Sequence, residues 1–255
     1  MSIKGITPEE LKVKVYENRS LMGAAAAEAV NQKINELLQK KKSINIIFAA
    51  APSQNEFLTE LGAKHIDWSR INAFHMDEYV NLDKDASQGF GNFLKDKLFS
   101  KVPFRAVHYL NGNAQNLELE CHRYSNLLEK YPTDIVCMGI GEKAHIAFND
   151  PHVANFNDQY LVKVVDLDEE CRNQQVNDGC FNIINEVPTH ALTLTVPALI
   201  KASYIFCMVP GERKAKAVYH TINDKINESY PSTILRTHTN AILFLDKDSS
   251  TLVNI

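Results

Sequence analysis

The sequence predicts an α/β fold of three layers, in which a mainly parallel sheet is covered by helices on both faces. Short apolar runs alternate with helical patterns along most of the chain, which is typical of strands joined by crossover helices. The 255 residues contain no repeat and no linker rich in Gly, Pro or Ser. We therefore expect a single domain over residues 1–255.

Five runs of four to eight residues have nearly continuous apolar character, which suits strands buried on both faces better than half-exposed strands. These runs are Ile44–Ala51, Ile71–Phe74, Asp134–Met138, Tyr204–Val209 and Ala241–Leu245. Leu161–Val165 and Leu192–Val196 are candidates for further strands.

Helices are predicted before and between these runs. The first begins near Thr7, because Thr7, Pro8 and Glu10 have the spacing of a capped helix start. A longer helix from about Ser20 to Lys40 has an Ala-rich middle and ends in cations that complement the helix dipole. The other predicted helices are Ser53–Leu61, Gly91–Phe99, Asn116–Lys130 and Gly211–Ile222.

The composition excludes several classes of protein. Hydrophobic residues make up 45% of the chain and charged residues 23%, which argues against a fibrous or disordered chain. A net charge of -4 gives no general attraction for nucleic acid or an anionic membrane surface. No apolar stretch approaches the ~20 residues that cross a bilayer. We therefore expect neither nucleic acid nor a membrane as partner.

Cysteine usage and the N-terminus indicate the compartment. The five cysteines are scattered and contain no Cys-x-x-Cys pair, which predicts neither a disulfide framework nor a zinc site. No secretory signal follows Met1. We expect a cytoplasmic protein, and we leave open whether it assembles into a homo-oligomer.

In open parallel sheets, ligands bind outside the carboxyl ends of the strands, so the residues after each predicted strand are candidates for chemistry. Ser53 and Gln54 follow the first run, and Ser53 has the spacing of a capping box with Glu56. A helix start offers free N–H groups to a phosphate. An ordinary capped loop and a phosphate site both fit this segment.

Two adjacent carboxylates, Asp77 and Glu78, follow the second run. Adjacent side chains of an extended segment point in opposite directions, so one can enter a cleft while the other anchors the loop. A carboxylate beside a sugar can move a proton between neighbouring carbons, which makes Asp77 a candidate acid/base. A solvated acidic turn fits equally well.

Glycines follow the third run. Gly139, Gly141 and Ala144 fit the Gly-x-Gly-x-x-Gly/Ala pattern of dinucleotide sites. We discount that interpretation because Pro151 soon interrupts the long helix that a pyrophosphate site needs. The two glycines would instead allow the backbone to approach a substrate closely.

His145, Asp150 and His152 lie in the same segment. Together they could hold a metal ion, although their spacing matches no standard ligand pattern. Alternatively, Asp150 could hold and polarise His145, which would then act as a general acid/base. A third interpretation is that His145 only satisfies backbone groups of the loop.

Arg213 and Lys214 fall in the first helical turn after the fourth run. Cations at this end of a helix oppose its dipole, and an anionic ligand bound to Lys214 would remove that cost. A plain exposed basic turn also fits.

The order and spacing of five segments resemble the glucosamine-6-phosphate isomerase/deaminase family, within the wider superfamily that includes the 6-phosphogluconolactonases. The resemblance extends from about Ile44 to the C-terminus. The segments that carry it are Phe74–Val80, Tyr109–Ala114, Gly139–Pro151, Val187–Thr193 and Pro210–Ala215.

The resemblance implies a Rossmann-like fold of the deaminase/lactonase type and roles for the matched residues. Asp77 matches the carboxylate that moves a proton between C1 and C2. His145 matches the histidine that assists opening of the pyranose ring, and Asp150 matches its acidic partner. Residues expected to contact the substrate or its phosphate are Ser53, Gln54, Gly139, Gly141 and Lys214.

The chain departs from the family pattern at three places. Lys143-Ala144 stands where the family has Asp-Gly before His145, and a cation there would lower the affinity of the imidazole for a proton. Pro52 offers no N–H to a phosphate. Asn173–Phe181 lacks the arginine that glucosamine-6-phosphate deaminases carry.

We predict an isomerase/deaminase that converts a hexosamine 6-phosphate into a ketohexose 6-phosphate and ammonia. No metal or organic cofactor is expected, because a 2-amino aldose can tautomerise by proton transfers alone. One alternative is a different substrate, as in a galactosamine-6-phosphate isomerase or a 6-phosphogluconolactonase-like hydrolase. The other, motivated by Lys143, is a sugar-phosphate sensor without catalysis.

Overall fold

The computed structural model describes residues 11–254. Within that range, a seven-stranded sheet has the order β1-β10-β9-β6-β2-β3-β5, and all neighbouring strands are parallel. A smaller antiparallel sheet has the order β4-β8-β7. The strands are β1 (Lys12–Tyr16), β2 (Ile44–Phe48), β3 (Ile71–His75), β4 (Asp77–Tyr79), β5 (Ala106–His108), β6 (Ile135–Met138), β7 (Val162–Asp166), β8 (His190–Leu194), β9 (Tyr204–Val209) and β10 (Ala241–Asp246).

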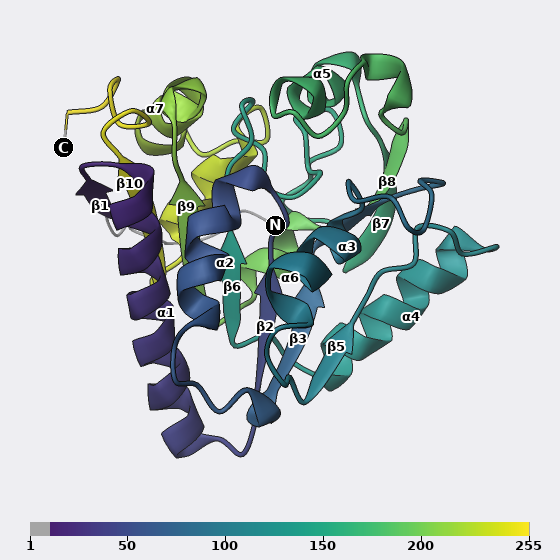
Figure 1. The fold of residues 1–255 in the computed structure, drawn as a ribbon. Helices are drawn as coiled ribbons and strands as arrows, with labels where there is room; N and C mark the ends of the chain where they lie inside the picture. The colour runs from purple at the N-terminus through teal and green to yellow at the C-terminus, as the bar shows by residue number, and fades with distance from the viewer. Residues whose placement is uncertain (1–10, 255) are drawn as a thin grey trace.

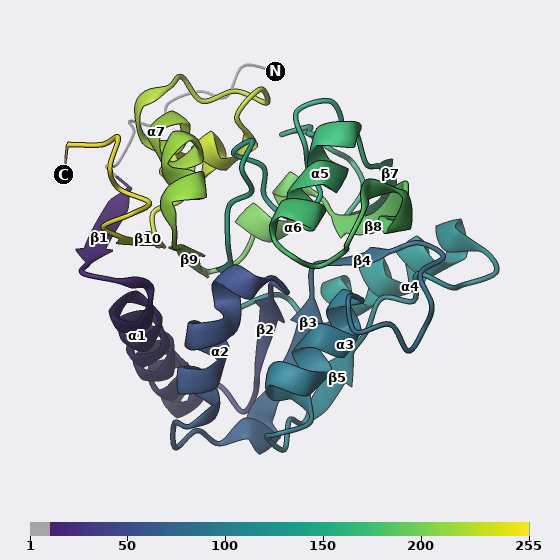
Figure 2. The ribbon, with the colours of Figure 1, turned by 45° about the horizontal axis from the view of Figure 1, so that its top comes forward.

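Helices cover both faces of the large sheet, which confirms the predicted three-layer architecture. They are α1 (Arg19–Lys40), α2 (Asn55–Gly62), α3 (Phe90–Leu94), α4 (Leu117–Lys130), α5 (Glu169–Asn177), α6 (Val196–Ile200) and α7 (Ala215–Asn223). Both ribbon views show α1 and α2 side by side, with β7, β8 and α5 grouped apart from them (Figure 1, Figure 2). Across residues 11–254, none of the helices combines the length and apolar character that crossing a membrane requires.

The core consists of two apolar clusters, one on each face of the sheet, and the side chains of β2 point alternately into one and the other. Ile44, Ile46 and Phe48 belong to the cluster that contains residues of α1 and α2, whereas Ile47 belongs to the cluster that contains residues of α4 and α7. Because both faces are buried, a strand of this sheet needs apolar residues at nearly every position. This explains the continuous runs in the sequence.

The five predicted runs overlap β2, β3, β6, β9 and β10, and the long helix predicted near the N-terminus is α1. Asn18 caps α1, because its side chain accepts a hydrogen bond of 3.0 Å from the N–H of Leu21. Leu161–Val165 and Leu192–Val196 do overlap strands, but β7 and β8 are antiparallel and belong to the smaller sheet.

Several elements escape prediction from the sequence. The expected helix start at Thr7 lies outside the described residues, and the chain after Leu11 is the edge strand β1. β1 is largely exposed and therefore lacks a continuous apolar run. Three predicted helices contain other geometry: Lys95–Phe99 is a π-helical turn, and Pro52–Gln54 and Glu212–Lys214 are 3-10 turns.

The strand order reverses between β2 and β6. From β2 the chain proceeds outward to β3 and β5, whereas β6 is followed by β9 on the other side. The loops at the carboxyl ends of such neighbouring strands diverge and leave a crevice for a ligand.

Candidate active site

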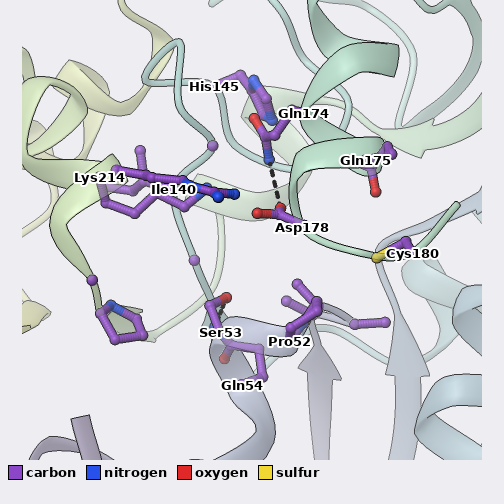
Figure 3. Close-up of a pocket in the computed structure, with 18 of the residues that line it drawn as sticks. Pro52, Ser53, Gln54, Ile140, His145, Gln174, Gln175, Asp178, Cys180 and Lys214 are labelled. Atoms are coloured by element: carbon purple, nitrogen blue, oxygen red, sulfur yellow. Dashed lines mark hydrogen bonds between the residues drawn. The ribbon is translucent and has the colours of Figure 1, made fainter. Parts of the chain in front are cut away.

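A cleft of about 490 Å³ lies at the carboxyl ends of β2, β3, β6 and β9. His145, Lys214 and Ser53 are directed toward the same space from three sides (Figure 3). Asp150 lies behind His145 and has no exposed surface. The other predicted site residues all line the cleft: Ser53, Gln54, Asp77, Gly139, Gly141, His145 and Lys214.

Asp77 and Glu78 point in opposite directions, as the alternation of an extended segment predicts. Asp77 lines the cleft and is 8% exposed. Glu78 anchors the following loop by accepting hydrogen bonds from the N–H groups of Tyr79, Phe90 and Gly91 at 2.9, 3.0 and 2.8 Å. Burial, and then the charge of Glu78, raise the pKa of Asp77 well above its usual value. Such a carboxyl group can both accept and return a proton.

His75 and Tyr124 fix the strand end that precedes Asp77, and the sequence did not reveal them. The buried Nε2 of His75 accepts a hydrogen bond of 2.8 Å from the N–H of Leu110. The Tyr124 hydroxyl donates to the carbonyl of His75 at 2.9 Å and accepts from its N–H at 3.1 Å. Burial lowers the pKa of His75 to about 3, so its ring is neutral and acts as a structural hydrogen-bond acceptor.

A tight turn after β6 presents His145 to the cleft. The N–H of Gly141 donates to the carbonyl of His145 at 2.9 Å, and the N–H of Ala144 donates to the carbonyl of Gly141 at 3.0 Å. Ala144 has a φ of 59°, in the left-handed region that favours glycine. At Gly139, an added Cβ would lie 3.1 Å from Nε2 of Gln54, so glycine allows the loops after β2 and β6 to approach.

Asp150 lies directly behind His145. Its Oδ1 is 2.8 Å from Nδ1 of His145, and both atoms are buried without a well-aligned hydrogen bond, so the pairing is chiefly electrostatic. Burial by itself raises the pKa of Asp150, but His145, Cys171 and Lys143 outweigh burial and bring the pKa below its usual value. An ionised Asp150 stabilises a protonated imidazole.

His152 does not join this pair. Its Nε2 lies 3.1 Å from Oδ2 of Asp166, and its Nδ1 lies 3.6 Å from Oδ2 of Asp168. In the described part of the chain, no three His, Cys, Asp or Glu side chains are arranged to hold a metal ion. The alternative in which His145, Asp150 and His152 form a metal site is therefore wrong.

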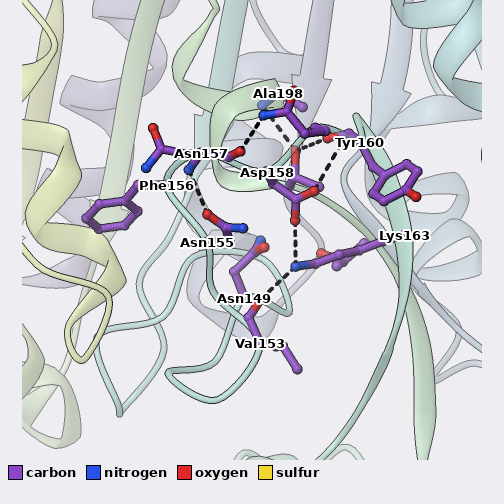
Figure 4. A network of polar contacts seen from close by, with 12 residues as sticks. Asn149, Val153, Asn155, Phe156, Asn157, Asp158, Tyr160, Lys163 and Ala198 are labelled. Carbon is purple, nitrogen blue, oxygen red and sulfur yellow. Dashed lines mark hydrogen bonds and ion pairs between the residues drawn. The ribbon is translucent and has the colours of Figure 1, made fainter. Parts of the chain in front are cut away.

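Polar contacts fix the chain on both sides of Asp150. The side-chain amide of Asn149, which is fully buried, donates to the carbonyl of Leu194 on β8 at 2.9 Å. Further along, Nζ of Lys163 on β7 lies 2.8 Å from Oδ2 of Asp158 (Figure 4). These contacts hold the segment after the loop that carries His145 against the smaller sheet.

Ser53 does not cap α2, so the predicted capping box is wrong. No side-chain hydrogen bond caps the 3-10 turn Pro52–Gln54 or the start of α2. Glu56 instead pairs with Arg19 at 2.6 Å. The hydroxyl of Ser53 accepts a 3.2 Å hydrogen bond from the amide of Gln54, whose Oε1 is buried without a partner. Both side chains therefore retain hydrogen-bonding capacity at the cleft.

Lys214 is 8% exposed and extends into the cleft (Figure 3). Burial lowers the pKa of its ammonium group; Asp178 and Glu142 oppose this shift, and Arg213 adds to it. A bound phosphate would supply negative charge next to this ammonium group and favour its charged form.

Helix α5 supplies a wall of the cleft that the sequence did not reveal. Oε1 of Gln174 accepts a 2.9 Å hydrogen bond from the N–H of Glu142, and its Nε2 lies 3.4 Å from Asp178 (Figure 3). Gln174 and Gln175 are buried and line the cleft. The sequence of α5 did carry one signal, because it has few apolar residues. The polar side chains of such a helix must face either solvent or a site.

A profile of the family described as glucosamine-6-phosphate isomerases/6-phosphogluconolactonase matches residues 17–244. This chain belongs to that family. A glucosamine-6-phosphate deaminase of Bacillus cereus (strain B4264) is 33% identical over 226 residues, which cover 89% of this chain and 84% of that protein. A glucosamine-6-phosphate deaminase of Bacillus thuringiensis (strain Al Hakam) matches with the same identity and coverage.

Solved structures agree with this family membership. A monomeric glucosamine-6-phosphate deaminase superposes with a TM-score of 0.85 at 26% identity, covering 95% of this chain and all of that one (100%). The 6-phosphogluconolactonase of Thermotoga maritima shares the fold, with a TM-score of 0.75 at 22% identity over 93% of this chain and 100% of its own. The resemblance inferred from the sequence is confirmed, and the family match begins before Ile44, at residue 17.

Proposed function

We propose that this chain is an amino-sugar-phosphate isomerase/deaminase similar to glucosamine-6-phosphate deaminases. It takes a hexosamine 6-phosphate and water and releases a ketohexose 6-phosphate and ammonia. One observation carries the proposal: Asp77 at the end of β3 and His145 in the loop after β6 line a single cleft. The substrate class is supported by the relatives named glucosamine-6-phosphate deaminase.

The phosphate group binds at the end of the cleft formed by the loops after β2 and β9. Lys214 supplies an ammonium group, and Ser53 supplies a hydroxyl group that can donate to the phosphate, because Nε2 of Gln54 donates to its oxygen and holds it at the cleft. Gly139 and Gly141 line the cleft, and their lack of side chains leaves room there for Gln54 and for the ring of His145. Pro52 cannot donate an N–H, so this site depends more on side chains than a glycine-rich loop does.

His145 assists opening of the pyranose ring. It exchanges a proton with the ring oxygen or the anomeric hydroxyl, and the open-chain aldose has the carbonyl group that isomerisation requires. Asp150 orients the imidazole and stabilises its charged form from behind, at 2.8 Å. Because Asp150 is fully buried, water does not compete for this carboxylate.

Asp77 then removes the proton from C2 and returns it to C1. The raised pKa of Asp77, caused by burial, suits a group that must hold the proton between the two steps. Together with the shift of a proton from the amine nitrogen to O1, the transfer converts the 2-amino aldose into the C2 imine of a ketose. Water adds to the imine carbon and ammonia leaves, so one water is consumed for each ammonia released.

The test is to assay the purified chain with glucosamine 6-phosphate and to measure ammonia and ketohexose 6-phosphate together. The proposal expects both products in equal amounts. Galactosamine 6-phosphate and 6-phosphogluconolactone are assayed in parallel, and preferential turnover of either assigns the chain to that substrate instead. Thermal stabilisation by the sugar phosphate without any product would identify a sensor. A cytoplasmic location and a homo-oligomeric state remain predictions.

A further inference from the structure

Lys143 lies two residues before His145 and carries a positive charge. Its ammonium group is paired with α5: Nζ lies 2.6 Å from Oδ2 of Asp168 and 2.7 Å from Oε2 of Glu170. The side chains of Lys143 and Asp168 are 25% and 32% exposed, so this pair is only partly screened by water, whereas Glu170 is 76% exposed and its pairing is screened more strongly. Two carboxylates at the start of α5 therefore pair with this cation beside the loop that carries His145.

Asp168 is held in place independently of Lys143. Its Oδ1 accepts a hydrogen bond of 2.8 Å from the N–H of Cys171, which makes Asp168 the N-cap of α5. Its Oδ2 also lies 3.6 Å from Nδ1 of His152. The position of the Asp168 carboxylate therefore does not depend on Lys143. Glu170 lies two residues further on, in the first turn of α5.

Asp150 is the competing acceptor. The charge of Lys143 is near enough to contribute to lowering the pKa of Asp150, although burial is the largest influence and acts in the opposite direction. Neither oxygen of Asp150 has a well-aligned hydrogen bond, so this buried carboxylate has the capacity to accept an ammonium group. A lysine paired with Asp150 would weaken the 2.8 Å pairing of Asp150 with His145.

We propose that Asp168 and Glu170 are positioning residues for the reaction: they hold the Lys143 ammonium group at the start of α5 and thereby leave Asp150 to His145. This inference rests on the proposed function of His145. Lys143 thereby joins the loop that carries His145 to the start of the helix that forms one wall of the cleft.

The test is the double variant Asp168→Asn/Glu170→Gln, which removes both charges. Asparagine caps helices as well as aspartate does, and glutamine keeps the shape of glutamate, so α5 should remain folded. We expect kcat for ammonia release to fall about tenfold with little change in KM, because the acid/base group is impaired and not the binding site. Adding Lys143→Met to the double variant should restore most of kcat, since no ammonium group is left to compete.

Glu169→Gln is the matched control: it removes a charge from the same turn of α5, but Glu169 is exposed and does not contact Lys143. It should leave kcat unchanged. An unchanged kcat in the double variant, or a loss that Lys143→Met does not rescue, overturns the proposal, because a purely structural role of the acids would not depend on the lysine.

The ring chemical shifts of His145 in NMR spectra, assigned by comparison with His145→Gln, report on its pairing with Asp150 and do not require turnover. We expect these shifts to change in the double variant, where Lys143 competes for Asp150, and to return to their wild-type values when Lys143→Met is added. If the wild-type chain released no ammonia but this pattern appeared, the positioning role would stand and the proposed function would fail.

Discussion

The ring of His145 occupies the space that any side chain on residue 141 would need. A Cβ atom built on Gly141 would lie 1.9 Å from Nε2 and 2.1 Å from Cε1 of His145. The conflict involves the end of a side chain and not the backbone, so a residue at position 141 should displace the imidazole without unfolding the protein. Gly141 therefore determines where the imidazole of His145 lies.

Gly141→Ala should reduce kcat for ammonia release by about 100-fold, the contribution expected of a positioned acid/base group. The melting temperature should change little, because the ring can turn away into the cleft. Steady-state kinetics and thermal unfolding measure the two effects. Gly62→Ala, at the end of α2 and outside the cleft, is the control and should retain full activity. Wild-type kcat in Gly141→Ala would show that the ring position is not critical.

Asp77→Asn should abolish turnover while the fold is kept, because asparagine cannot carry the proton from C2 to C1. Ammonia release and ketohexose 6-phosphate formation are the measurements, with circular dichroism to monitor the fold. Asp85→Asn makes the same change at an exposed position and should be without effect. Substantial turnover by Asp77→Asn would remove Asp77 from the proton-transfer step.

The same substitution should increase stability at neutral pH. The pKa of Asp77 is raised in the folded protein, so the folded chain keeps a proton that the unfolded chain releases above about 3.8. The wild type therefore loses stability as pH rises from that value toward the folded pKa, by about 1.4 kcal/mol per pH unit. Asparagine does not ionise, so Asp77→Asn should be the more stable protein at pH 7. Urea unfolding at several pH values tests this, and a gain that persisted unchanged at pH 3 would contradict it.

Much of the large sheet could be predicted because its central strands are buried on both faces, which leaves continuous apolar runs such as Tyr204–Val209. Strands that are not buried on both faces were not predicted. Lys12–Tyr16 forms an exposed edge, and Ala106–His108 is only three residues long. The direction of β7 and β8 could not be predicted either, because apolar content does not specify whether a strand pairs with the large sheet or with a second one.

The candidate site was predicted from residues that follow strands, and the cleft does bring Asp77 together with His145. The partners that hold these residues come from distant parts of the sequence and left no local signal. Tyr124 reaches the end of β3 from α4, and Asp168 meets Lys143 from α5. At Ser53 a local signal was present but misleading. Its spacing with Glu56 matched a capping box, but Glu56 forms an ion pair with Arg19 instead.

Lys214→Met should raise KM for the sugar phosphate about 10- to 100-fold with a much smaller change in kcat. The lost binding free energy is that of one charge-assisted hydrogen bond, about 1.5–3 kcal/mol. Because this contact is made equally in the ground state and the transition state, its loss changes KM and not kcat. Inorganic phosphate should also become a weaker competitive inhibitor. Lys216→Met, two residues away and exposed, is the matched control. Unchanged KM and unchanged phosphate inhibition would place the phosphate elsewhere in the cleft.

Ala147→Gly should stabilise the protein, although glycine usually weakens a fold. Ala147 has a φ of 48°, a left-handed conformation that costs an alanine about 1 kcal/mol and glycine almost nothing. Because the methyl group is only partly buried, its removal sacrifices little packing, while the added flexibility of the unfolded chain offsets part of the gain. We expect the free energy of unfolding in urea to rise by a few tenths to about 1 kcal/mol. Ala25→Gly, in the interior of α1, provides the contrast and should lower it by about 0.5–1 kcal/mol. Equal destabilisation by both substitutions would mean that the loop does not hold Ala147 in the left-handed region in solution.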